Sequence, residues 1–142
     1  MTYRPIADNY TVSGQISPDE VSQIAALGFK TLIDNRPDSE VPPEFQTEAM
    51  KAAAEAAGLT FVANPFSHAA FSMNIVERQS EALDAAEGPV FAYCASGNRC
   101  TILWAIGQVT SGAQGIDDVV AAAAAQGYDL SGLAAQLRSM AG

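Results

Sequence analysis

The sequence has 142 residues, of which 49% are apolar and 16% are charged, and its net charge is −9. A chain of this size is typical of one globular domain that buries about two-thirds of its unfolded surface. The negative charge repels nucleic acid and anionic membranes, so we expect neither as a partner. An anionic substrate would need a local positive site.

The chain alternates between predicted strands and helices. Ser17 is a candidate N-cap, Pro18 suits the first helical position, and Glu20 can complete a capping box. Gly28 is expected to end this helix. In chain order the sequence predicts a strand over 10–15, a helix over 18–27, a strand over 29–34, a polar turn over 35–40, a helix over 44–57, a strand over 59–63, an irregular loop over 64–72, a helix over 73–86, a strand over 89–93, and helices over 100–111, 116–126 and 131–140.

This order predicts an α/β fold: a small, mainly parallel sheet of about four strands with helices on both faces. The segment 100–111 is apolar nearly all round and is expected to be a central helix. Ligands of open α/β sheets bind at the carboxyl ends of the strands, where the turn 35–40 lies. Arg36, Asp38 and Glu40 in this turn are either a solvated surface or, for Arg36, a second anion contact or a brace for the loop.

A cysteine loop follows the last predicted strand, with Cys94, Gly97 and Arg99 between the strand and a helix. Backbone N–H groups and the helix dipole at such a place favour a thiolate. Arg99 can offer two donors to a phosphate or sulfate, and Gly97 permits a positive φ. Many cysteines at strand ends are inert core residues, but this context favours an anion-binding loop.

The cysteines and the absence of targeting signals give an expectation for the cellular compartment. Cys94 and Cys100 are the two cysteines, and a pair in one short stretch forms no disulfide framework. Neither an N-terminal signal peptide nor a membrane-spanning apolar run is evident. We expect a cytoplasmic chain of one domain, residues 1–142, with no metal ion or cofactor. Its oligomeric state is left open.

These features resemble the superfamily of protein tyrosine and dual-specificity phosphatases. More narrowly, the chain resembles the phosphatase-like domain of bacterial beta-lactamase hydrolase-like proteins. The resemblance rests on the segments 13–15, 34–38, 94–99 and 127–130. It extends over about residues 10 to 130, and the combined spacing is more specific than any one motif.

The resemblance implies a cysteine-dependent hydrolase of phosphomonoesters. Cys94 would attack phosphorus and form a cysteinyl-phosphate, while loop N–H groups and Arg99 bind the oxygens. Thr101 matches the hydroxyl that eases departure of the thiolate. The substrate would be an anionic small molecule or a phosphoprotein. The expected substrate-binding residues are Ala95, Ser96, Gly97, Asn98, Arg99 and Arg36.

Two departures from the superfamily pattern concern the loop itself. Four residues separate Cys94 from Arg99, whereas phosphatases of this superfamily have five. The shorter spacing is similar to that of rhodanese-like sulfurtransferases, whose loop binds a persulfide. Cys100 stands where the narrower family usually has a hydroxyl residue, and it is either packed and inert or able to resolve an oxidised Cys94.

The third departure concerns the general acid. Phosphatases of this type take an aspartic acid from the loop after the third predicted strand, but residues 64–72 contain no carboxylate. His68 is the proton donor that this loop offers, and Asp34 and Asp38 are competitors from the neighbouring turn. Loss of a general acid typically costs about 10²–10⁴ in rate.

Three functions therefore remain in view. The wider pattern favours a phosphatase-like hydrolase, which we place first. The loop length and the missing carboxylate favour a sulfurtransferase or persulfide carrier. A non-catalytic anion-binding module would keep Gly97 and Arg99 but would not need Cys94.

Overall fold

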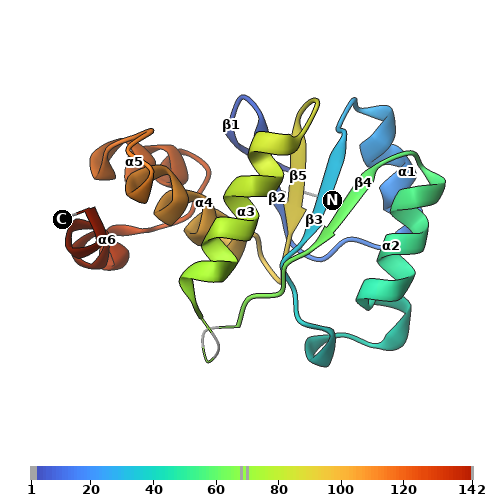
Figure 1. Ribbon diagram of the computed structural model, residues 1–142. Coiled ribbons are helices and arrows are strands. Elements are labelled where there is room, and N and C mark those ends of the chain that lie inside the picture. The colour runs from blue at the N-terminus through green and yellow to red at the C-terminus, as the bar shows by residue number, and fades with distance from the viewer. Residues whose placement is uncertain (1–2, 68, 70, 142) are drawn as a thin grey trace.

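The computed structural model describes residues 3–67, 69 and 71–141. In this part of the chain five strands form one sheet, in the order β1-β2-β5-β3-β4 (Figure 1). The strands are β1 (Arg4–Ala7), β2 (Tyr10–Ser13), β3 (Thr31–Asp34), β4 (Thr60–Ala63) and β5 (Val90–Tyr93). β2 to β5 are parallel, and β1 pairs antiparallel with β2. The predicted α/β fold with a small, mainly parallel sheet is confirmed.

The middle of the sheet is buried on both faces. Every residue of β2, β3 and β5 is buried, as expected for parallel strands between two helical layers. The register aligns the last residues of these strands, Ser13, Tyr93 and Asp34, in one row. The loops that follow the three strands therefore leave the same edge of the sheet.

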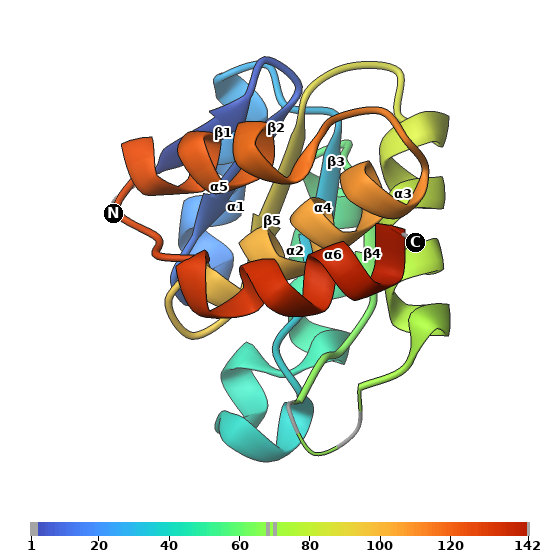
Figure 2. The ribbon, with the colours of Figure 1, turned by 90° about the vertical axis from the view of Figure 1, so that its left-hand side faces the viewer.

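Helices cover both faces, as Figures 1 and 2 show. One face carries two of them and the other carries four, of which the last two pack against α4. The helices are α1 (Pro18–Ala26) and α2 (Thr47–Ala56) on the first face, and α3 (Met73–Ala85), α4 (Asn98–Thr110), α5 (Ile116–Ala125) and α6 (Ala134–Ala141) on the second. Short 3-10 turns are η1 (Asp38–Glu40), η2 (Pro43–Phe45) and η4 (Ser131–Leu133). No helix within the described residues has the length and apolar character needed to cross a membrane.

Local chemistry explains the two best-predicted helices. The N–H of Ser17 donates to Glu20 Oε1 at 3.0 Å, and Gly28 has a φ of 100° just after α1, so both ends agree with the prediction. α4 is the central helix, and Leu103 and Ile106 lie in the larger core. Burial of side chains of this kind contributes about 1.5–3 kcal/mol each.

Two elements differ from the prediction by three residues at a boundary, and the others by two or fewer. α2 begins at Thr47 instead of residue 44, because Gln46 is extended and the Asp38 carboxylate accepts hydrogen bonds from the N–H and hydroxyl of Thr47 at 2.7 and 2.8 Å. The predicted helix over 131–140 is a 3-10 turn followed by α6. β1 was not predicted. Ile6 is the one buried residue in this strand, so its sequence lacks the alternation of apolar and polar residues that indicates a strand.

Candidate active site

Cys94 lies at the carboxyl end of the central strand β5, where a short loop connects to α4. Gly97 has a φ of 90° and is the N-cap of the helix. This conformation is strained for any residue with a side chain, which explains the glycine. Ala95 and Ser96 are exposed, whereas Cys94 and Arg99 are buried. The predicted arrangement of strand, loop and helix N-terminus is present.

Hydrogen-bond donors surround the sulfur of Cys94. The N–H of Gly97 donates to Sγ at 3.1 Å. The thiol of Cys100, and then the backbone N–H groups of Cys100, Ser96 and Gly97, lower the pKa of Cys94 to about 5, although burial acts in the opposite direction. A thiol with this pKa is ionised at neutral pH and is therefore a nucleophile.

Cys100 occupies the first turn of α4 and is fully buried. Burial, followed by the side chain and charge of Cys94, raises the pKa of the Cys100 thiol well above its usual value. Cys100 therefore keeps its proton, and its thiol is the group that lowers the pKa of Cys94 most. Both cysteines are free. The sequence suggested either a packed or a resolving residue. The structure packs Cys100 in the core, and its thiol lowers the pKa of Cys94, an effect that the sequence did not reveal.

The guanidinium of Arg99 is bound on one side by Glu40. Its Nη1 and Nη2 atoms donate to the two carboxylate oxygens at 2.9 and 2.7 Å, and Nη1 also donates to the carbonyl of Phe66 at 2.9 Å. The hydrogen bond from Arg99 lowers the pKa of Glu40, which remains ionised. A carboxylate that takes two parallel hydrogen bonds fixes the plane of the guanidinium. Glu40 is thus a site residue that the sequence left among surface candidates.

Arg36 braces the same carboxylate from the turn after β3. Its Nε lies 3.2 Å from Glu40 Oε1, and its Nη1 donates to Gln15 Oε1 at 3.2 Å. Arg36 therefore lies beside the Arg99 pair and links the turn to the segment after β2. Of the two functional roles considered for it, the structure provides the contacts of a loop brace.

The hydrogen bonds that the structure gives Asp34 and Asp38 are made outside the cysteine loop. Asp34 shares a sheet face with Leu32 and Tyr93, whereas the larger core that contains Cys94 lies on the opposite face. Burial, above all, raises the pKa of Asp34 to about 6, and one of its oxygens accepts the N–H of Arg36 at 2.9 Å. The carboxylate of Asp38 is bound to the start of α2. Among the described residues, neither makes a hydrogen bond to the cysteine loop.

Thr101 and His68 complete the predicted set. The hydroxyl of Thr101 donates to the carbonyl of Gly97 at 2.9 Å and is buried, so it holds the loop where the helix begins. Asn98 donates its N–H to the hydroxyl of Ser96 at 3.3 Å. His68 lies outside the described residues.

A buried polar network behind the loop was not predicted. Gln79 on α3 bonds Asn35, Asn64 and the hydroxyl of Tyr10 at 2.8–2.9 Å, and Tyr10 donates to the carbonyl of Cys100 at 2.7 Å. Gln79 falls in the buried stripe of α3, and a polar residue at such a position is the signal that the sequence offered. The network connects the turn after β3 and the loop after β4 to the first turn of α4.

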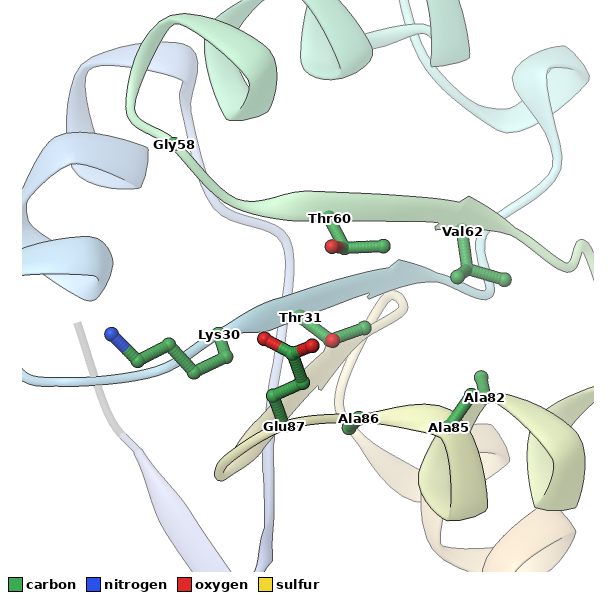
Figure 3. A pocket seen from close by; sticks show the side chains of 9 residues that line it. All are labelled: Lys30, Thr31, Gly58, Thr60, Val62, Ala82, Ala85, Ala86 and Glu87. Atoms are coloured by element: carbon green, nitrogen blue, oxygen red, sulfur yellow. The ribbon is translucent and has the colours of Figure 1, made fainter.

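A cavity of about 280 Å³ lies elsewhere (Figure 3). Lys30, Thr60 and Glu87 line it, together with alanines of α3. Lys30 and Glu87 precede β3 and β5, so the cavity is near the amino ends of the strands. It does not include any of the loop residues 94–99.

The family described as beta-lactamase hydrolase-like protein, phosphatase-like domain, matches residues 2–111. The chain belongs to this family. A beta-lactamase hydrolase-like protein of Xylella fastidiosa (strain Temecula1) is 33% identical over 125 residues, which are 88% of this chain and 29% of the relative. This phosphatase-like chain therefore spans about 29% of the length of the curated relatives that it matches.

Solved structures agree with the family. The crystal structure of a candidate phosphatase from Neisseria meningitidis Z2491 is 31% identical, with a TM-score of 0.84 and coverage of 99% of both chains. Tk-PTP in its active form has a TM-score of 0.71 at 13% identity and covers 98% of this chain and 95% of its own. At that identity the likeness concerns the fold alone, which is that of a protein tyrosine phosphatase-like domain.

Proposed function

We propose that this chain is a cysteine-dependent hydrolase of phosphomonoesters. The family and the fold support a phosphatase-type function. The observation that carries the proposal is the contact of the Gly97 N–H with Cys94 Sγ, in a loop that lowers the pKa of that thiol to about 5. Arg99 lies two residues further along, with a carboxylate that orients it.

The first step would transfer the phosphoryl group to the enzyme. The Cys94 thiolate attacks phosphorus, an S–P bond forms, and the P–O bond to the leaving group breaks. The backbone N–H groups of residues 95–99 and the Arg99 guanidinium stabilise the charge on the three remaining oxygens. The departing oxygen takes up a proton, for which His68, Asp34 and Asp38 are the sequence candidates.

The second step would release phosphate. Water attacks phosphorus, the S–P bond breaks, and Cys94 leaves as a thiolate. The donors that lower the Cys94 pKa also make it a better leaving group. Thr101 supports this step by holding the Gly97 carbonyl, which keeps the loop in place around the sulfur.

A paired assay tests the proposal. Wild type and Cys94→Ser are incubated with p-nitrophenyl phosphate, whose leaving group departs without an acid. We expect hydrolysis by wild type and its loss in the variant. Equal rates for the two proteins would contradict a role for the cysteine.

A sulfurtransferase is the second candidate, because four residues, instead of five, separate Cys94 from Arg99. In this function Cys94 would take a sulfur atom from a donor such as thiosulfate, releasing sulfite, and pass it to an acceptor such as cyanide. Thiocyanate production by wild type, without hydrolysis of p-nitrophenyl phosphate, would favour it. Activity in neither assay would favour an anion-binding module.

A further inference from the structure

The peptide between Ser96 and Gly97 is held at both of its polar ends. On one side the hydroxyl of Tyr128 donates to the carbonyl of Ser96 at 2.8 Å. On the other side the N–H of Gly97 donates to Cys94 Sγ at 3.1 Å. The carbonyl and N–H of a trans peptide point in opposite directions. A hydroxyl that fixes the carbonyl therefore also aims the N–H at the sulfur.

Tyr128 is itself well anchored. It follows α5 and donates its N–H to the carbonyl of Ala123 at 2.9 Å. The guanidinium of Arg4 lies 5.5 Å from the centre of its ring and donates to the carbonyl of Gln126. Tyr128 is 8% exposed, so its ring position is set by packing. The loop is thus held by a residue more than thirty positions away in sequence.

Contact between Tyr128 and the loop is close. A Cβ at Gly97 would lie 2.2 Å from the Tyr128 oxygen, and the φ of Gly97 is already in the left-handed region. Burial, above all, raises the pKa of Tyr128, so its hydroxyl keeps its proton as a donor through the neutral range. The hydroxyl of Tyr128 therefore occupies the space that a side chain at position 97 would need.

We propose that Tyr128 is a positioning residue that fixes the Ser96–Gly97 peptide with its N–H directed at the sulfur of Cys94. This role rests on the proposed function, because it prepares the cysteine to act as a nucleophile. Without the hydroxyl, the carbonyl of Ser96 loses this hydrogen bond, and the peptide can rotate further. Its N–H then turns from the sulfur, and a hydrogen bond to a charged atom is lost.

The test compares Tyr128→Phe with Tyr3→Phe, which removes a hydroxyl from a residue that contacts Phe91 on the other face of the sheet. The Tyr3 hydroxyl has no hydrogen-bond partner among the described residues, so its loss should be neutral. Alkylation by iodoacetamide is followed against pH, and trypsin cleavage after Arg99 separates Cys94 from Cys100. We expect the midpoint for Cys94 to rise by about half a pH unit or more in Tyr128→Phe, and to stay unchanged in Tyr3→Phe.

An unchanged midpoint in Tyr128→Phe would overturn the positioning role, even if its thermal unfolding temperature fell, because a merely structural role predicts that pattern. An equal shift in both variants would also overturn it. The experiment uses no substrate, so its outcome is separate from that of the phosphatase assay. An ordinary cysteine midpoint in wild type would instead count against the proposed function.

Discussion

At the scale of single residues, the site concentrates donors on one sulfur atom. The donors come from two sources: the Cys100 thiol and the backbone N–H groups of the loop. Unlike the backbone N–H groups, the Cys100 thiol can be removed by a substitution. Cys100 stands where the resembling family usually has a hydroxyl residue, and a hydroxyl would serve as the same kind of donor.

Replacement of Cys100 tests the side-chain donor. In Cys100→Ala the Cys94 thiolate loses the donor that lowers its pKa most, so the pKa should rise towards the usual range for a thiol. Cys100→Ser is the matched control, because its hydroxyl can still donate. Each variant contains one cysteine, so the pH dependence of alkylation reports Cys94 directly. Identical midpoints in the two variants would contradict the donor role.

Arg99→Lys tests the guanidinium. A lysine keeps the charge but cannot bind Glu40 and two phosphate oxygens in one plane. We expect turnover of p-nitrophenyl phosphate to fall by about 10²–10³. A matched control is Arg78→Lys on α3, outside the contacts described for the site. Near-normal turnover in Arg99→Lys would argue against bidentate binding of the substrate.

At the scale of elements, the loop is enclosed by segments that sequence periodicity does not identify. Gly14, just after β2, packs so closely on the loop that a Cβ there would lie 2.9 Å from the carbonyl oxygen of Ala95. Tyr128, in the segment after α5, contacts the loop through the carbonyl of Ser96. The loop geometry is therefore fixed by β2 and by the segment after α5, as well as by its own residues.

Gly14→Ala tests this enclosure. The added methyl group meets a backbone atom, so the loop must shift, and we expect turnover to fall about tenfold or more. Gly132→Ala is the matched control, because nothing lies within 4 Å of its added Cβ. Steady-state rates with p-nitrophenyl phosphate provide the measurement. Equal rates in the two variants would show that the loop tolerates the contact.

Local signals predicted the elements well, and long-range contacts explain what they missed. The cap at Ser17 and the positive φ at Gly97 depend on neighbouring residues and were readable from the sequence. The pairing of Glu40 with Arg99 joins residues 59 positions apart, and nothing in the local pattern distinguishes Glu40 from a surface residue. The cysteine loop was therefore predictable, but most of the residues that orient it were not.

At the scale of the whole molecule, one buried carboxyl couples the fold to pH. Asp34 is 2% exposed and lies at the carboxyl end of β3. Its pKa is raised from 3.8 to about 6, chiefly by burial. The folded state therefore binds a proton more tightly than the unfolded chain. Its contribution to stability is full below about pH 4 and is lost as the pH rises through about 6.

Asp34→Asn should remove this dependence. The amide stays neutral and its oxygen can still accept the N–H of Arg36. Between pH 4 and pH 7 the free energy of unfolding of wild type should therefore fall by about 2.4 kcal/mol relative to that of the variant. Urea unfolding at the two pH values measures the difference. A constant gap between the two proteins would contradict the raised pKa. A large loss of turnover with phenyl phosphate, whose poor leaving group needs a proton, but not with p-nitrophenyl phosphate, would support Asp34 as the general acid.

The proposed mechanism requires the loop over residues 94–99 to enclose a tetrahedral oxyanion against the sulfur of Cys94. A crystal structure of the wild-type protein grown with tungstate, a tetrahedral oxyanion, would show whether it does. We expect tungstate next to Cys94 Sγ, with the loop N–H groups directed at its oxygens and Arg99 bound to two of them. An empty loop with its N–H groups turned outward, or tungstate bound elsewhere, would contradict it.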